Sequence, residues 1–390
     1  MMSMKSTKTT KAMTVPEAAL LDLLAGREGE TGALGEAEWQ RVLGLARDHG
    51  VAQLIPEGLK ARGIAPPQEV ASKVQGVLLA CAVRNMRLFH QLGVMLRAFR
   101  EAGIPVVPVK GAWLGQVIYG NVAQRTMSDV DLWLQRERLD EARKVMESLG
   151  YSSRSKEDRP QALQDALSGE TQFFKPGATM VELHWNIMSG EWLRISGRCD
   201  EKAIWERTVP AEQDDCRYLI PEDAVIHLCV HLAVNHQMSQ STLRTLVDLD
   251  RLRRRARIDW DVVARRAREW KVATAVWLVL SSLSELLGDP SGELPLAGLA
   301  PSPLRSSILR RFVNPERIMG VLTITAGPKR FLFLLALVDR PRDAVRLVGQ
   351  AVIPDREWLT LRYGLEDSPP WRVGVQRLWH PLRAVFRREL

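Results

Sequence analysis

The sequence has few cysteines, no CxxC pair and no long apolar run. Four cysteines occur in 390 residues, and the missing CxxC spacing excludes a zinc ribbon and a dithiol redox motif. Their separations suggest no disulfide framework, so we expect a reducing, cytoplasmic environment. Residues 1–14 are polar and basic without the apolar segment of a signal peptide, and we expect a disordered tail there. The apolar stretch 331–338 is too short to span a bilayer, so no membrane association is expected.

Two common nucleotide-binding signatures are also missing. The sequence has no GxxxxGK[ST] loop and no GxGxxG after a strand, which argues against P-loop and Rossmann enzymes. His227 and His231 lie one helical turn apart, but no glutamate lies between them as in an HExxH zinc site. For these two histidines and for His236 we expect structural hydrogen bonds, with contact to a bound base left open. A second DxD, Asp248 and Asp250, falls on a helical pattern that turns the two side chains apart, so a structural or solvated role is expected.

Basic residues exceed acidic ones, and the formal net charge is +8. Eight arginines fall between Arg251 and Arg268, and a further group lies in 372–388. This distribution suits an anionic partner such as a nucleotide, a nucleic acid or an acidic peptide. Arginines on solvated helix faces explain the same pattern, and we expect that simpler explanation to hold for most of them.

The periodicity of apolar residues divides the chain into three parts. Spacings of three and four residues predict helices over 15–103 and again over 221–390. Between them, 104–220 alternates strand and helix patterns. Strands are expected in IPVVPV, SDVDLWL, TQFFK and TMVELHW, and a helix in RERLDEARKVMESLGY. We therefore predict an α+β fold, in which a mixed sheet with helices is flanked by N- and C-terminal helical regions.

Asp129 and Asp131 carry the first signal for chemistry. On a strand, alternate side chains point to the same face, so these two carboxylates lie side by side. Adjacent like charges repel each other, and a fold that keeps them together usually compensates with a cation. Hard oxygen ligands suit magnesium, which also binds substrate phosphates. A lone DxD is common on solvated surface loops, so this pair needs further support.

Glu182 supplies that support from a second strand. Its neighbours Val181 and Leu183 argue against an exposed edge, and a carboxylate among apolar residues is costly unless it is solvated or paired. If this strand lies beside that of Asp129, three carboxylates can hold two metal ions for an in-line nucleotidyl displacement. His184 shares the face of Glu182, and we expect it to contact substrate rather than to bind metal.

Lys110 and Gly111 follow a buried strand pattern and begin a short helix. A helix N-terminus offers unpaired N–H groups to phosphate, the glycine permits close approach of the backbone, and the lysine adds a positive charge. Arg125 precedes Asp129 by four residues. It could reach the same phosphates or pair with a surface acid, and both alternatives are open.

Together these residues resemble a known family. The segment VPVKGAWLGQVIYGNVAQRTMSDVDLWL, then a helix, LGY and VELHW, is similar to the uncharacterised nucleotidyltransferase family of bacterial proteins. That family lies within the DNA polymerase β-like nucleotidyltransferase superfamily. The likeness is strong over 104–187 and looser over most of the remaining chain. The matching positions are Lys110, Gly111, Tyr119, Arg125, Asp129, Asp131, Gly150, Tyr151, Glu182, His184 and Trp185.

The resemblance implies a nucleotidyltransferase-type sheet and phosphate contacts around Gly111. The superfamily usually has Gly-Ser or Gly-Gly at the start of the helix, whereas Ala112 and Trp113 follow the glycine here. Lys110 and Arg125 are therefore expected to hold the phosphates.

The function implied is transfer of a nucleoside monophosphate from a nucleoside triphosphate, such as ATP, to an acceptor hydroxyl or phosphate. Two Mg²⁺ ions are expected: Asp129 would bridge both, Asp131 would support the nucleotide metal and Glu182 the catalytic metal. The acceptor can be a peptide, a small molecule or RNA. Three alternatives remain: a tailoring enzyme that uses another phosphate-linked donor, such as a sugar, on a peptide; a toxin that modifies tRNA; and a non-catalytic nucleotide or nucleic-acid binder.

Overall fold

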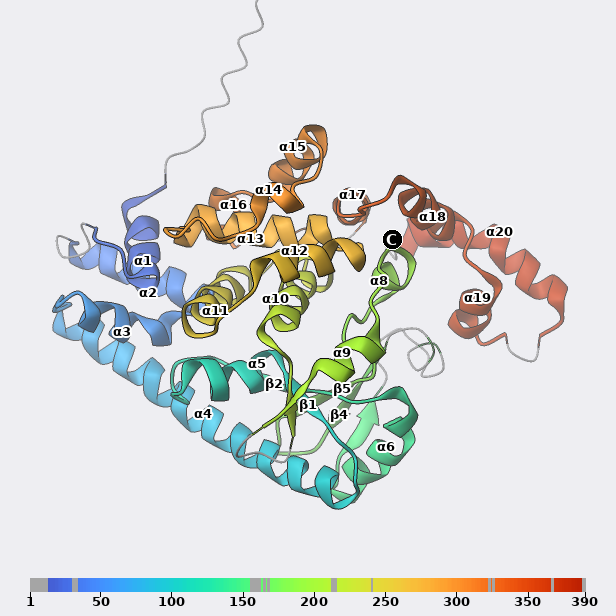
Figure 1. Cartoon of the computed structure of the whole chain (residues 1–390), viewed down its shortest axis with the longest axis horizontal. Helices are drawn as coiled ribbons and strands as arrows, with labels where there is room; N and C mark the ends of the chain where they lie inside the picture. The colour runs from blue at the N-terminus through green and yellow to red at the C-terminus, as the bar shows by residue number, and fades with distance from the viewer. Residues whose placement is uncertain are drawn as a thin grey trace, which may run out of the picture.

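The computed structural model describes residues 13–29, 34–154, 163, 166, 169–211, 216–239, 241–321, 324, 327–365 and 368–387. The tail predicted at 1–14 lies outside the described residues except for its last two. In the described chain a small mixed sheet packs among many helices (Figure 1), so the predicted α+β fold with helical flanks is confirmed. The boundaries drawn at 103 and 220 stay a prediction.

Among the described residues, four α-helices precede the sheet. They are α1 (Val15–Ala25), α2 (Glu36–Asp48), α3 (Ile55–Ala61) and α4 (Gln68–Glu101). α4 is the longest of these, with 34 residues. Its buried residues Leu88, Leu92, Met95 and Phe99 recur every three or four positions, so its second half presents one apolar stripe to the sheet.

Five strands form the main sheet, in the order β1-β2-β5-β4-β3. They are β1 (Val107–Val109), β2 (Asp129–Trp133), β3 (Ser152–Arg154), β4 (Glu170–Phe174) and β5 (Met180–His184). β2 and β5 run parallel, and the other neighbouring strands are antiparallel. β1 leads directly into α5 (Lys110–Trp113), which continues as a π-helical turn over Leu114–Tyr119.

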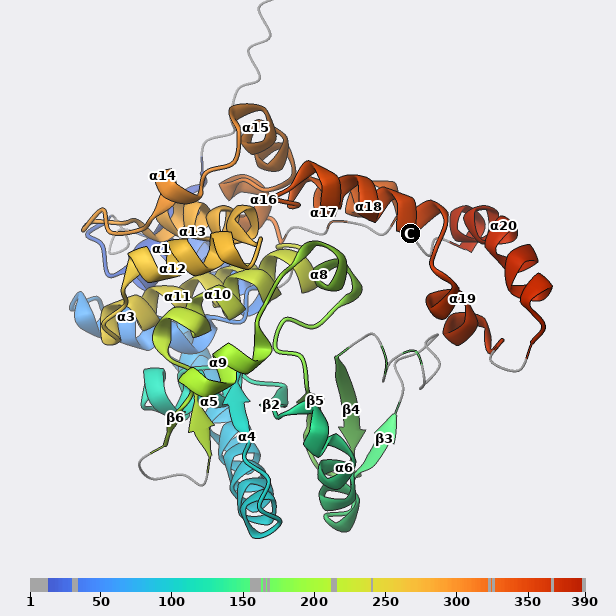
Figure 2. The same ribbon diagram turned by 45° about the vertical axis from the view of Figure 1, so that its right-hand side comes forward.

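Side-chain alternation gives the sheet two different faces. Val130, Leu132, Val181 and Leu183 are buried on one face, in a core shared with α4 and α6 (Leu139–Ser148). The carboxylates of β2 and β5 consequently lie on the opposite face. Figure 2 shows α4 and α6 below the sheet and the later helices above it.

The later helices begin after β5. They are α8 (Glu191–Ser196), α9 (Glu201–Arg207), α10 (Pro221–Val230), α11 (Thr242–Arg255), α12 (Trp260–Glu269) and α13 (Ala273–Leu287). α10 continues as a second π-helical turn over His231–Asn235. Asp259 caps the start of α12, because its Oδ1 accepts hydrogen bonds of 3.1 Å from the backbone N–H groups of Asp261 and Val262.

Mostly short helices, five of which begin with a proline, make up the described C-terminal part. They are α14 (Leu296–Leu299), α15 (Pro303–Phe312), α16 (Pro315–Met319), α17 (Pro328–Ala336), α18 (Pro341–Val352), α19 (Arg356–Tyr363) and α20 (Pro370–Arg387). α17 to α20 extend to one side of the molecule (Figure 2). Trp192 in α8 ties this arm to the rest, because its indole N–H donates a 2.9 Å hydrogen bond to the backbone carbonyl of Leu334.

Three strands lay outside the expectations from sequence. β3 has three residues, and the separate β6 (Val209–Pro210) and β7 (Arg217–Tyr218) have two each. Elements this short contain no full alternation, so periodicity does not reveal them. Among the described helices, none is both long enough and apolar enough to cross a bilayer. The four cysteines, all in the described chain, form no disulfide.

Candidate active site

The three predicted carboxylates lie on adjacent strands. Parallel pairing of β2 with β5 puts Asp131 directly beside Glu182, and Asp129 lies two residues earlier on the same face. Burial raises the pKa of Asp129, and the charges of Asp131 and Glu182 raise it further. The sheet therefore holds negative charges at a density that favours a bound cation.

Lys110 supplies one cation to this cluster. It follows Val109, the register partner of Asp131, and its backbone has the rare positive φ of 50°. Its ammonium donates a 2.7 Å hydrogen bond to Asp131 Oδ1 and lies 3.9 Å from Glu182 Oε2. Burial lowers the pKa of Lys110, but the two carboxylates outweigh it and raise the pKa above its usual value. Lys110 therefore stays charged.

His184 lies at the centre of the carboxylate cluster. Its Nε2 is 3.0 Å from Asp131 Oδ1 and 3.6 Å from Glu182 Oε2, and its Nδ1 is 3.3 Å from Glu170 Oε2. Burial and Lys110 lower the pKa of His184, but the three carboxylates together raise it well above its usual value. The same contacts hold the pKa of Glu182 low, against the effect of burial. The cluster is thus a compact network of paired charges.

The donor atoms of this network fit a divalent metal ion. One ligand atom each from Asp131, Glu182 and His184 lies within 4.8 Å of the others. The two carboxylates suit Mg²⁺ or Mn²⁺, whereas the imidazole is a donor that zinc and other transition-metal ions prefer. Asp129 is outside this trio but lines the same cavity. His184, which we expected to contact substrate and not metal, is therefore placed among the possible ligands.

Arg125, expected at the phosphates, is held by a buried acid. Its guanidinium makes a two-pronged ion pair with Asp248 of α11, with Nε–Oδ1 at 3.0 Å and Nη2–Oδ2 at 2.9 Å. The Tyr119 hydroxyl donates a 2.7 Å hydrogen bond to the same carboxylate. Asp248 is fully buried, so of the two roles expected for it the structural one holds and the solvated one is wrong. Its DxD partner Asp250 is also buried, against the side chain of Arg253.

Gly111 packs beneath Arg125. A Cβ at this position would overlap the Arg125 guanidinium and approach Met127 Cγ to 3.2 Å. The glycine was expected to bring the backbone close to phosphate, and it brings the backbone close to Arg125. Both residues line the cavity, so contact with a phosphate stays a prediction.

Two histidines, one in the second π-helical turn and one directly after it, line the cavity of the site. The rings of His231 and His236 lie 4.5 Å apart, edge to face, and both line the cavity. Burial, assisted by Lys110, lowers the pKa of His236 to about 4 and that of His231 well below its usual value. Both rings are neutral near pH 7 and can accept a hydrogen bond through one nitrogen.

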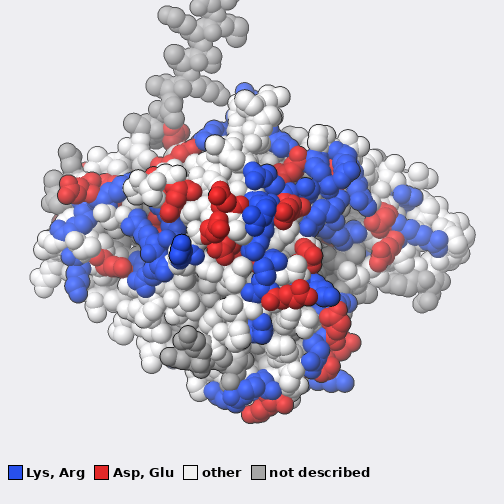
Figure 3. All heavy atoms as spheres, in the orientation of Figure 1, with Lys and Arg blue, Asp and Glu red and all other residues white. Residues whose placement is uncertain are grey.

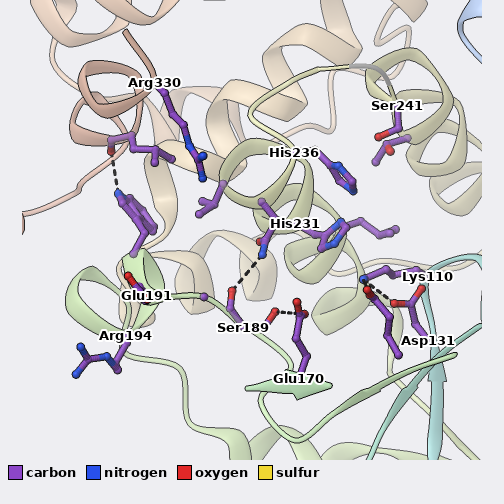
Figure 4. A pocket seen from close by; sticks show the side chains of 18 of the residues that line it. Lys110, Asp131, Glu170, Ser189, Glu191, Arg194, His231, His236, Ser241 and Arg330 are labelled. Atoms are coloured by element: carbon purple, nitrogen blue, oxygen red, sulfur yellow. Dashed lines mark hydrogen bonds and ion pairs between the residues drawn. The ribbon is translucent and has the colours of Figure 1, made fainter. Parts of the chain in front are cut away.

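The cavity above the carboxylates is large enough for a nucleotide and a second molecule. Its volume is about 850 Å³, at the upper end for small-molecule sites. Figure 4 shows Lys110 and Asp131 at one end and Arg194 and Arg330 at the other, with His236 between them on the upper wall. The far end is formed by α8 together with α17, α18, α19 and α20.

Comparison with models of known protein families shows to which family the chain belongs. The model described as "Uncharacterised nucleotidyltransferase" matches residues 35–288. The chain belongs to this family. Members of this family are transferases of phosphorus-containing groups, and the general reaction is nucleotidyl transfer. Searches of curated proteins and of solved structures gave no match.

Two residues of this nucleotidyltransferase site were not predicted from sequence. Glu170 lies opposite His184 in the register of β4 and β5, and Arg244 reaches the cavity from α11. The alternation of TQFFK with the preceding Glu170 could have indicated the first residue. No local pattern distinguishes Arg244 from the other arginines of its helix.

Proposed function

We propose that this protein transfers a nucleoside monophosphate from a nucleoside triphosphate to an acceptor hydroxyl or phosphate. The observation that carries the proposal is the trio Asp129, Asp131 and Glu182 on paired parallel strands, facing a cavity of about 850 Å³. The family match supports nucleotidyl transfer as the general reaction. The four cysteines without a disulfide agree with a reducing, cytoplasmic location.

Asp129, Asp131 and Glu182 would hold Mg²⁺ at the catalytic end of the cavity. Bound there, Mg²⁺ would neutralise charge on the phosphates and polarise the reacting phosphorus. The low pKa of Glu182 keeps its carboxylate charged and ready to act as a ligand. Glu170 fixes the ring of His184 from the side away from Asp131, and so orients the imidazole that lies among the ligands.

The chain's own residues would position the reacting groups. The acceptor oxygen attacks the α-phosphorus, the bond to the bridging oxygen of the β-phosphate breaks, and pyrophosphate leaves. The acceptor proton passes to a base, for which Glu182 is the candidate. Lys110, with Gly111 and Arg125 beside it, would present positive charge to the phosphates. His184 is buried and does not line the cavity, so its contact with the nucleotide stays a prediction.

The acceptor would bind at the far end of the cavity. Trp358 of α19 lines that end, and its indole N–H donates a 3.1 Å hydrogen bond to Glu191 of α8. Phe331 and Arg194 line it as well, so this end combines aromatic surface with positive charge. Figure 3 shows further Lys and Arg side chains gathered over α17 and α18, where Arg342 and Arg346 are exposed. These features favour an acceptor with both an apolar and an anionic part.

A product assay tests this function. The full chain is incubated with Mg²⁺, each of the four NTPs and a panel of peptides, small molecules and tRNA, and the products are analysed by mass spectrometry. We expect an acceptor heavier by one nucleoside monophosphate residue, together with free pyrophosphate. Transfer of a sugar from a nucleotide sugar would favour the tailoring alternative, and labelled tRNA the toxin alternative. NTP binding without any product across the panel would contradict the proposal.

The non-catalytic alternative rested on the arginine-rich helices. Most arginines between Arg251 and Arg268 have partners inside the chain. Examples are Arg253 with Asp250 and Asp289, and Arg266 with Asp223. These contacts weigh against an anionic partner for most of the arginines. They also tie Arg253 into a buried ion pair, whereas the simpler explanation from sequence put these arginines on solvated helix faces.

A further inference from the structure

The polyphosphate of a donor nucleotide needs cations, and the two predicted from sequence are already paired. Lys110 is bonded to Asp131, and Arg125 is held by two hydrogen bonds to Asp248. A nucleoside triphosphate carries about four negative charges near neutral pH; Mg²⁺ would offset part of this charge, and side-chain cations bind the phosphate oxygens through charge-assisted hydrogen bonds. The catalytic end therefore calls for a cation that has no carboxylate of its own.

Arg244 is such a cation. It lies in the first turn of α11 and lines the cavity together with Asp129 and Ser128. Within the described chain it forms no ion pair, and its Nε is buried without a hydrogen-bond partner. Burial of a guanidinium nitrogen without a hydrogen-bond partner is costly, so its position in a cavity points to an anionic ligand.

The packing around Arg244 explains why it stays unpaired. Asp248 lies one helical turn further along α11 and would be its natural partner, but that carboxylate is occupied by Arg125 and Tyr119. On the other side, Gly50 packs against the Arg244 side chain: a Cβ at Gly50 would lie 3.7 Å from Arg244 Cδ and Nη1. Burial lowers the pKa of Arg244, and neighbouring Arg125 lowers it further.

The neighbours of Arg244 offer further hydrogen bonds to an anion. Ser241, just before α11, and Thr245 in its first turns line the cavity, and the neutral ring of His236 lines it as well. Figure 4 shows Ser241 and His236 on the wall above Lys110. The backbone between them turns through Gln237 and Met238, both with positive φ, at 51° and 53°. Two consecutive non-glycine residues in this conformation mark a strained segment, of the kind held in place around ligand sites.

We propose that Arg244 binds the polyphosphate tail of the donor nucleotide, with Ser241, Thr245 and His236 completing the subsite from α11 and the turn before it. This inference rests on the proposed function and names the element that grips the phosphates where the Gly-Ser helix start is absent. The terminal two phosphates would lie on Arg244 while the α-phosphate remains at the carboxylates. As pyrophosphate leaves with the electrons of the broken bond, its added negative charge would be stabilised by the guanidinium.

Binding measurements on Arg244→Gln test the proposal. Isothermal titration with Mg²⁺ present compares inorganic pyrophosphate, an α,β-methylene NTP analogue and the matching nucleoside monophosphate. We expect the variant to lose about 10- to 100-fold in affinity for the first two ligands, as for a charge-assisted hydrogen bond, and to bind the monophosphate as the wild type does. The matched control is Arg254→Gln. Arg254 is exposed on the same helix and lies outside the cavity lining, so all three affinities should stay unchanged.

Failure of this inference and failure of the proposed function give different results. Unchanged pyrophosphate and analogue binding in Arg244→Gln, with normal binding in the wild type, overturns the role of Arg244 and leaves nucleotidyl transfer standing. Pyrophosphate binding that depends on Arg244, in a wild type that binds no nucleotide, supports the anion site and overturns the nucleotide donor. A wild type that binds neither ligand overturns both. Melting curves check folding, and no loss of stability is expected because Arg244 has no partner to lose.

Discussion

The Arg125 guanidinium and the Asp248 carboxylate form a buried two-pronged ion pair between residues 123 positions apart. The pair joins the loop before β2 to α11, and Tyr119 adds a third hydrogen bond to it. Both catalytic-end walls of the cavity are thereby fixed relative to each other.

Removal of one partner from this pair should be strongly destabilising. Asp248→Asn leaves the Arg125 guanidinium buried without a full counter-charge, so we expect the free energy of unfolding to fall by about 3–5 kcal/mol. Urea denaturation followed by circular dichroism measures it. Asp261→Asn, on the exposed start of α12, is the control and should change stability by less than about 1 kcal/mol. Equal stability of the two variants would contradict a role for the pair in holding the walls together.

Gly111→Ala should displace Arg125. The added methyl group overlaps the guanidinium, so we expect a loss of about 1–3 kcal/mol and weaker nucleotide binding. Gly76→Ala is a matched control, because Gly76 lies within α4 with open space around its Cβ position. That change should stabilise the protein by up to about 1 kcal/mol. Thermal melting distinguishes the two, and an equal response would show that Gly111 has no tight contact.

Asp129→Asn should separate metal binding from folding. Because Asp129 has a raised pKa, its ionised form is disfavoured in the fold, and removal of the charge should leave the metal-free melting temperature unchanged or higher. Mg²⁺-dependent binding of NTP should weaken by about 100-fold or more, equivalent to about 2.8 kcal/mol. Mn²⁺ titration by electron paramagnetic resonance gives a direct reading of the metal. The exposed Glu141→Gln should bind Mn²⁺ normally. Undiminished Mn²⁺ binding by Asp129→Asn would remove this residue from the ligand set.

Glu201 should make stability depend on pH. Burial raises its pKa to about 7, although its Oε2 accepts a hydrogen bond of 3.1 Å from the Ile187 N–H. The folded state then holds a proton that the unfolded state loses near pH 4.5, so this group lowers stability as pH rises from about 4.5 to 7. Glu201→Gln should therefore be more stable than the wild type at pH 8, by about 2–3 kcal/mol, with little difference at pH 4.5. A pH-independent difference in urea midpoints would show that Glu201 titrates normally.

Trp358→Ala should affect the acceptor and spare the donor. Trp358 lies at the cavity end away from the carboxylates, so we expect KM for an identified acceptor to rise about 10-fold and KM for NTP to stay constant. The exposed Trp371→Ala, outside the cavity lining, serves as control. A rise in both KM values for Trp358→Ala would place the donor at this end instead.

The sequence alone was enough to predict the candidate site residues that lie along single strands. Alternation in DVD and VELH put Asp129, Asp131 and Glu182 on one face, and the fold pairs those strands directly. The sequence did not predict the contacts that depend on packing between segments far apart in the chain. Arg125 pairs with Asp248 of α11, and because that carboxylate is occupied, Arg244 has no ion-pair partner among the described residues. No local pattern encodes which of two arginines an aspartate will bind.

The part of the chain that forms the far end of the cavity bears on how the acceptor preference could change between related proteins. The family match ends at residue 288, whereas Arg330, Phe331 and Trp358 come from helices beyond it. The carboxylates of the proposed active site and most of the surface that would recognise the acceptor thus lie in separate stretches of the chain, although α8 contributes to that surface from within the matched region. If 328–380 were exchanged between related proteins, the recipient would then acquire the acceptor preference of the donor protein and keep its own phosphorus chemistry.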